Sequence, residues 1–350
     1  MFILDPYKLS FLNIGLFGIF SYWFLKYKPK FIKTIIVISI LPIISFFRNT
    51  DFNGGIIQNS AFSASFYLSM SEGNIIPRWA ENLDTQFGYP AFLYIYPLPL
   101  YISAVFHFLG FSFVNSTKLV FVVTYILSGI WMWKWARLKF NPWVAMAVTT
   151  AYLFAPYRFI NMHFRLDIGE SVAVALLPLL FYYLDKGNKI GISLLVLFLI
   201  LAHPAISVSG LFLVFGYLVV RKEFKKLLFV ILGVIMASYY WLPIVLESQF
   251  ANVAYYTKVI EFFPWQNYVF SPFRFGLMYQ GGAGLMVFPI GYTLIFITAL
   301  SFIQLKKKNK RIKFWLAGFL SVCFMLLPKS AWLWNNLPLI DKFQFSYRLM

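Results

Sequence analysis

Long apolar runs separated by short basic segments make up most of the chain. A membrane-spanning helix needs about 20 predominantly apolar residues. Ten runs approach that length: 9–25, 32–48, 117–134, 142–158, 168–185, 189–203, 205–220, 227–247, 284–305 and 312–328. One helix through 189–220 would be about 46 Å long, well beyond a hydrocarbon core of about 30 Å, so a hairpin broken at His203-Pro204 is expected. The pattern predicts an all-α, polytopic membrane bundle of about ten spans.

The segment 91–109 is apolar enough to span but does not fit this scheme. Counting it as a crossing would invert every later loop, including the basic run KKKNKRIK at 306–313. Pro90, Pro97 and Pro99 also interrupt it, and proline inside a helix costs about 3 kcal/mol. We therefore expect an interfacial or re-entrant segment on the outer face. The alternative is an extra span compensated by the fusion of two others.

These assignments divide the chain into three parts. Residues 1–48 form an N-terminal transmembrane hairpin, and 49–116 form a large outer loop containing the interfacial segment. Residues 117–350 form the main transmembrane bundle, with a second outer loop at 248–283. The N-terminus then lies outside.

Composition supports a lipid environment. Apolar residues make up 61% of the chain and charged residues 12%, against about 45–50% and 25% in soluble domains. A single cysteine, Cys323, excludes a disulfide framework or a cysteine-ligated metal cluster. The chain belongs in a bilayer.

The net charge of +18 is concentrated in a few short loops. Segments 26–33, 134–139, 186–189, 221–226 and 306–313 carry 19 of the 30 basic residues; of the 12 acids, only Glu223 lies within them and Asp185 directly beside them. Basic loops mark the cytoplasmic side, so we expect a multi-pass protein of the cell membrane with its large loops extracytoplasmic. Nucleic acid is not an expected partner, because its recognition needs a basic face on a folded domain.

Two polar residues of the first outer loop are candidates for chemistry. Asp51 follows the second run and can accept a proton or hold a metal beside a lipid-facing groove, although its surroundings, RNTDFNGG, also suit a turn. Arg78 can meet a phosphate through its planar guanidinium. Its neighbour Trp79 makes a loop anchor at the headgroup level the alternative.

A second group of candidates lies near 158–170 and at the hairpin tip. Arg165 can pair with Glu170 at the membrane edge, where ionisable groups are costly and therefore functional candidates, or the pair only fixes the loop. His203 can contact a phosphate or cap the following helix. The spacing of the three histidines gives no support to a zinc site, and no P-loop or HExxH motif is present.

Several short motifs, in order over about 300 residues, carry a resemblance. They are GNIIPRW (73–79), GYP (88–90), YPLPLY (96–101), LSG (127–129), APYR (155–158), RLDIGE (165–170), WLPIVLE (241–247), SPFRFG (271–276) and FQFSYR (343–348). The chain resembles a family of bacterial multi-pass membrane proteins called pyruvoyl-tetrahydropterin-synthase-related. That family is similar to the GT-C superfamily of polyprenyl-phosphate-sugar glycosyltransferases.

The resemblance implies a GT-C-like architecture in which juxtamembrane helices of the first outer loop cover a membrane-embedded groove. It implies transfer of a sugar, with inversion, from a polyprenyl-phosphate donor to a glycan or lipid acceptor. Asp51 would be the base, and Glu170 would orient Arg165 or the sugar. Arg78, Arg165 and His203 would lie near the donor phosphate. A divalent cation cofactor is left open.

The chain also departs from the family pattern. Relatives often place a histidine shortly after the aspartate, where Gly55 and Ile56 stand here. Relatives open with one span rather than two and continue beyond the 343–348 motif, so a truncated form is expected. Two alternatives are a non-catalytic flippase or accessory protein for lipid-linked glycans, with charges along a path through the bilayer, and a purely structural envelope protein.

Overall fold

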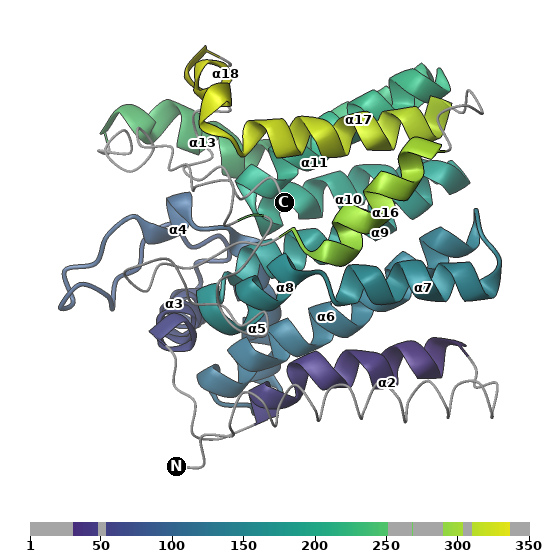
Figure 1. The fold of residues 1–350 in the computed structure, drawn as a ribbon. Helices are drawn as coiled ribbons and strands as arrows, with labels where there is room; N and C mark the ends of the chain where they lie inside the picture. Colours follow the sequence, from purple (N-terminus) through teal and green to yellow (C-terminus); the bar gives the residue numbers. More distant parts are fainter. Residues whose placement is uncertain (1–30, 48–53, 251–267, 269–289, 304–309, 337–350) are drawn as a thin grey trace.

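The computed structural model describes residues 31–47, 54–250, 268, 290–303 and 310–336 (Figure 1). Within these residues the regular secondary structure is helical. The only extended pairing there is an isolated antiparallel bridge between Ala80 and Tyr89. The predicted all-α class is confirmed for the described residues.

The core of the bundle is built on the helices α6, α9 and α10. α6 (Phe113–Arg137) packs along α9 (Ile168–Lys186), and α9 packs along α10 (Lys189–Ala202). Around them lie α2 (Phe31–Ile43), α7 (Pro142–Leu153), α11 (Pro204–Arg221), α12 (Leu227–Met236), α16 (Tyr292–Ile303) and α17 (Lys310–Met325). Most of these helices run roughly along one direction (Figure 1).

Local capping explains where several of these helices begin and end. Side-chain oxygens of Ser112, Asn141 and Asn188 accept the backbone N–H three residues later at the starts of α6, α7 and α10. Such N-caps satisfy amide donors that the helix itself leaves without partners. α9 ends at Gly187, whose φ of 70° is the left-handed conformation favoured by glycine at helix ends.

Three described helices, α6, α9 and α11, are long and apolar enough to cross a membrane. The number is five if two bent pairs each count as one span. In the first pair, residues 224–236 and α13 (Ser238–Glu247) meet at 62°. In the second, α17 meets the segment 328–336, which includes α18 (Ala331–Asn336), at 96°. These helices are consistent with membrane association.

Several predicted spans are shorter or more broken than the apolar pattern suggests. The run 142–158 stops at Leu153 because Pro156 begins a separate short helix, α8 (Pro156–Ile160). The run 32–48 gives α2 followed by a 3-10 turn, η1 (Ile44–Phe47). The predicted hairpin break is confirmed, since α10 ends at Ala202 and α11 begins at Pro204. The run 9–25 lies outside the described residues.

The first loop region folds into helices across one end of the bundle. α3 (Gly54–Ser71) and α5 (Pro97–Phe108) pack on each other and on α6, and α4 (Ala91–Tyr94) precedes α5. Phe66, Phe92 and Leu100 form the buried centre of this layer. Pro97 stands in the first turn of α5, where proline is tolerated. The segment 91–109 therefore forms two short helices.

Three of the basic loops gather at the other end of α9. Asp185 accepts hydrogen bonds from Trp135 at 2.8 Å and from Tyr217 at 2.6 Å. It also pairs with Lys139 at 3.0 Å and with Arg221. Burial lowers the pKa of Lys139, and the adjacent Asp185 carboxylate opposes that shift. One carboxylate thus joins the basic ends of α6, α9 and α11.

Candidate functional site

The candidate site lies at the N-terminal end of α9. The chain leaves α8 through a π-helical turn, η2 (Asn161–Arg165), and Leu166 then adopts a left-handed conformation with φ 51°. Asp167 caps α9, because its Oδ1 accepts the Glu170 N–H at 3.0 Å. This tight reversal directs the side chains of Arg165, Asp167 and Glu170 toward one another.

Arg165 and Glu170 form a bidentate ion pair. Nη1 of Arg165 lies 2.6 Å from Oε2 of Glu170, and Nη2 lies 3.0 Å from Oε1. Tyr157 donates its hydroxyl to Oε2 at 2.7 Å and accepts from Arg165 at 2.7 Å. Glu170 is fully buried and Arg165 nearly so. Burial alone would lower the pKa of Arg165, but Glu170, Tyr157 and Asp167 together outweigh it and leave that pKa raised.

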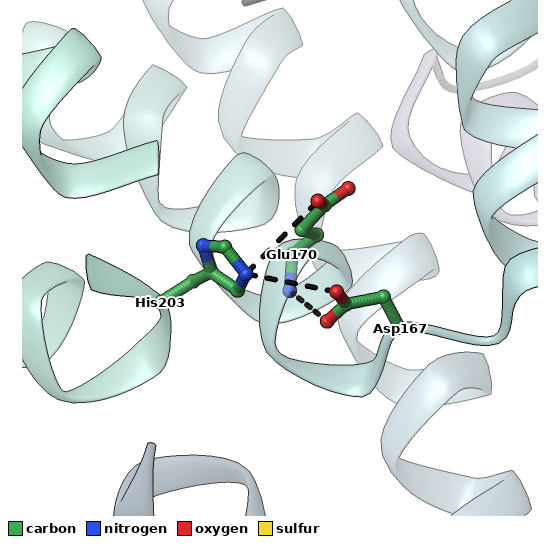
Figure 2. A group of neighbouring side chains, drawn as sticks. All are labelled: Asp167, Glu170 and His203. Carbon is green, nitrogen blue, oxygen red and sulfur yellow. Dashed lines mark hydrogen bonds and ion pairs between the residues drawn. The ribbon is translucent and has the colours of Figure 1, made fainter. Parts of the chain in front are cut away.

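His203 faces the same carboxylates from the break between α10 and α11. Its Nε2 lies 3.6 Å from Oδ2 of Asp167 and 4.0 Å from Oε1 of Glu170. Figure 2 shows the imidazole directed toward both carboxylates. Its Nδ1 accepts the Ile206 N–H at 3.3 Å and so caps α11. Tyr96, just before α5, donates its hydroxyl to Oδ1 of Asp167 at 2.7 Å. We call Tyr96, Tyr157, Arg165, Asp167, Glu170 and His203 the polar cluster.

Two close approaches hold the polar cluster together. A Cβ on Gly169 would lie 2.4 Å from the Tyr96 ring and 2.5 Å from the Ala202 carbonyl oxygen. Only glycine therefore allows the end of α10 and Tyr96 to reach α9. On the other side, Asn59 of α3 donates to the Leu166 carbonyl at 2.8 Å. The layer of α3 and α5 and the hairpin break both depend on this corner.

Asp167, Glu170 and His203 approach one another as metal ligands do, with donor atoms within 4.8 Å. Two features oppose a divalent cation in this geometry. The Arg165 guanidinium already supplies positive charge, 2.6 Å from Glu170 and 3.5 Å from Asp167. In neutral His203 the Nδ1 lone pair faces Ile206 N–H, so the proton sits on Nε2 and no lone pair is offered there. The residues present fit an internal ion-pair network better than a metal.

The structure brings together three of the five sequence-predicted site residues: Arg165, Glu170 and His203. Arg78 lies elsewhere, 4.0 Å from Glu247, and both side chains are about half exposed. Asp51 lies outside the described residues, and its predicted role stays a prediction. His203 does cap the following helix, as the alternative interpretation held.

Sequence reasoning gave no separate role to Asp167, Tyr96 and Tyr157. The spacing D-I-G-E is that of an N-cap acid followed by an acid at the third helical position, which marks Asp167 as a local anchor. Tyr96 lies 71 residues from Asp167 in sequence. No local pattern signals that contact.

Arg158 is a second cation near the polar cluster, and it is partly buried. Its guanidinium lies between the rings of Tyr125 and Tyr152, 4.6 and 4.5 Å from their centroids, and Nη2 donates to Ser128 at 2.8 Å. Within the described part of the chain, its Nη1 and the Asn161 Oδ1 have no hydrogen-bond partner. Both residues line a cavity of about 20 Å³, and a single water fits a space of that size and bridges a donor and an acceptor.

Comparisons with known proteins give one informative match. No family model matches the chain, and no solved structure matches it. The chain is similar to an uncharacterized protein of Lactococcus lactis subsp. cremoris (strain MG1363), with 24% identity over 341 residues. The match covers 88% of this chain and 55% of that protein. The chain thus spans about half the length of this relative.

Proposed function

We propose that this chain is, or forms part of, an integral membrane glycosyltransferase of GT-C type with about ten spans. Its donor is a polyprenyl-phosphate-linked sugar and its acceptor a glycan or lipid at the extracytoplasmic face of the cell membrane. The observation that carries the proposal is the polar cluster, which lies at the end of the bundle where α3 and α5 pack. Buried ionisable groups at such a position are costly to maintain and mark functional sites.

The reaction requires a base and stabilisation of a leaving phosphate. The base removes the proton from the acceptor hydroxyl while its oxygen attacks the anomeric carbon. The bond between that carbon and the phosphate oxygen breaks, and the polyprenyl phosphate departs with the electron pair. Attack from the opposite face inverts the anomeric configuration. Asp51 is the proposed base, and in the sequence it lies three residues before α3.

The cluster geometry refines the roles of the other residues. Both terminal nitrogens of Arg165 are engaged by Glu170, and one also by Tyr157. Arg165 therefore acts on a phosphate through its fixed charge rather than by direct contact, with Glu170 as its positioning partner. His203 stands at the hairpin tip with only its Nε2 directed into the cluster. It is the proposed direct phosphate ligand, which it contacts as a hydrogen-bond donor.

A second candidate is a flippase or accessory protein for lipid-linked glycans. Arg78 lies apart from the polar cluster and Arg158 is stacked inside the bundle. Charges distributed in this way suit a path for a phosphate through the bilayer better than one reaction centre. Substrate translocation without bond cleavage would support this candidate over the enzyme.

The test uses the chain in proteoliposomes with a panel of polyprenyl-phosphate pentoses and hexoses and bacterial lipids as acceptor. Release of polyprenyl phosphate measures cleavage even when the acceptor is unidentified. Loss of a general base typically costs about 10²–10⁴-fold, so Asp51→Asn should lower release by at least that lower factor.

Asp84→Asn is the matched control. Asp84 is an exposed loop acid with φ 54°, a conformation that asparagine also tolerates, so release should be unchanged. Equal release by wild type and Asp51→Asn would remove Asp51 from the mechanism. No release from any donor, together with movement of labelled lipid across the bilayer, would favour the transporter.

A further inference from the structure

At the basic end of the bundle, opposite the polar cluster along α9, the C-terminus of α11 meets the N-terminus of α17. A pocket of about 320 Å³ lies between them, lined by Val220, Arg221, Glu223, Lys310 and Arg311. Three of its five lining residues are cationic. They come from segments about 90 residues apart in sequence, so the fold, rather than a local run of charge, creates the pocket.

The acids near this pocket are already engaged. Glu223 accepts from Arg221 at 2.8 Å and from Lys226 at 2.5 Å. Asp185 pairs with Lys139 and Arg221. The side chains of Lys310 and Arg311 add two positive charges at the exposed rim. Around the pocket, the described cations outnumber the described carboxylates, so the local charge favours an anion.

An exposed apolar stripe leads away from the pocket along α11. Phe212, Phe215 and Val219 follow helical spacing and are 57%, 55% and 38% exposed. Val219 directly precedes Val220, a residue of the pocket wall. From Phe212 to Val219 the helix rises about 10 Å at about 1.5 Å per residue. It also borders the α17 contact, where the Phe314 ring lies 2.8 Å from a Cβ placed on Gly216.

We propose that this pocket binds the headgroup of an anionic phospholipid, whose acyl chain lies along Phe212, Phe215 and Val219. The charge complementarity selects the phosphate, and the adjoining apolar stripe selects a lipid over a soluble anion. Basic pockets between transmembrane helices are recurrent sites for anionic headgroups. This proposal does not depend on the glycosyltransferase proposal, because the pocket and the polar cluster lie at opposite ends of α9.

The test is native mass spectrometry of the detergent-purified chain with dioleoyl phosphatidylglycerol or dioleoyl phosphatidylcholine. These lipids share acyl chains and differ in headgroup charge. The wild type should retain one phosphatidylglycerol at concentrations where phosphatidylcholine is lost. Lys310→Gln should weaken retention about fivefold, the effect of one basic residue near an anionic surface, and Phe215→Ser should also weaken it.

Lys329→Gln is the matched control, because Lys329 is an exposed lysine just beyond the other end of α17. It should leave retention unchanged. Equal retention of both lipids would overturn the proposal, as would equal losses from Lys310→Gln and Lys329→Gln. Displacement of phosphatidylglycerol by inorganic phosphate at similar concentration would identify a free-anion site and would also overturn it. Lys310 is exposed, so Lys310→Gln should leave the thermal midpoint unchanged.

Discussion

The buried pair of Arg165 and Glu170 gives the sharpest prediction about stability. In Arg165→Met, Glu170 keeps the Tyr157 hydrogen bond but loses both bonds from the guanidinium. Glu170 is fully buried, and breaking a buried ion pair by removing one partner costs about 3–5 kcal/mol. At roughly 2 °C per kcal/mol for a long chain, the unfolding midpoint should fall by about 6–10 °C.

The assay can use the chain's own thiol. Cys323, the single cysteine, is partly buried on α17, so a thiol-reactive fluorophore reports its exposure as the bundle unfolds. The double variant Arg165→Met/Glu170→Leu should recover most of the loss, because replacing both members of a buried pair with apolar groups is often neutral. A midpoint within 2 °C of wild type for Arg165→Met alone would refute this account of the pair.

The double variant also separates stability from chemistry. If the pair only holds the corner between η2 and α9, the double variant should be as active as the wild type in the donor-cleavage assay. If Arg165 stabilises a phosphate, activity should be lost although the midpoint is restored. The proposed function predicts the second outcome.

Three further predictions concern other contacts. Asp185→Asn should destabilise the protein by about 3 kcal/mol, because the nearly buried carboxylate loses its ion pairs with Lys139 and Arg221. Glu223→Gln removes a more exposed carboxylate from its ion pairs and should cost about 1 kcal/mol or less. Similar unfolding midpoints for Asp185→Asn and Glu223→Gln would contradict this difference. Gly169→Ala should cost about 1–3 kcal/mol through overpacking. Gly318→Ala, whose new Cβ would meet no atom closer than 3.7 Å, should cost under about 0.5 kcal/mol, as thermal unfolding would show. Burial lowers the pKa of His163 from its ordinary 6.5. Below pH 6.5 the unfolded chain therefore binds more protons than the folded protein. The stability that neutral His163 gives to the folded protein is complete above that pH and is lost as the pH falls. The midpoint of His163→Phe should fall less than that of the wild type between pH 7.5 and 5.

Part of this architecture follows directly from the sequence. The apolar runs predict helices, and the length of 189–220 together with the His203-Pro204 pair predicts the break between α10 and α11. Proline positions also explain why α5 starts at Pro97 and α8 at Pro156. The bend of 62° near Ala237 is different. Gly233 precedes it and Ser238 and Pro243 follow it, so the sequence holds residues that permit a bend, but the apolar run 227–247 does not mark where the bend falls.

The candidate site is predictable only in part. Arg165 and Glu170 are five residues apart, so their pairing can be expected from local sequence. The contacts of Tyr96 and His203 with Asp167 join segments separated by 71 and 36 residues. They depend on the close approach at Gly169, which only the packed fold reveals. Arg78 is the opposite case, because the sequence made it a candidate phosphate ligand but the fold places it away from the polar cluster.

The short length of α10 has a consequence for how a ligand arrives. From Lys189 to Ala202 the helix rises only about 20 Å, against a hydrocarbon thickness of about 30 Å. In the proposed membrane orientation, which puts the basic loops at headgroup level, the imidazole of His203 would sit roughly 10 Å below the opposite interface. A molecule carrying a long isoprenoid tail would then reach it by lateral diffusion within the leaflet, without leaving the hydrocarbon.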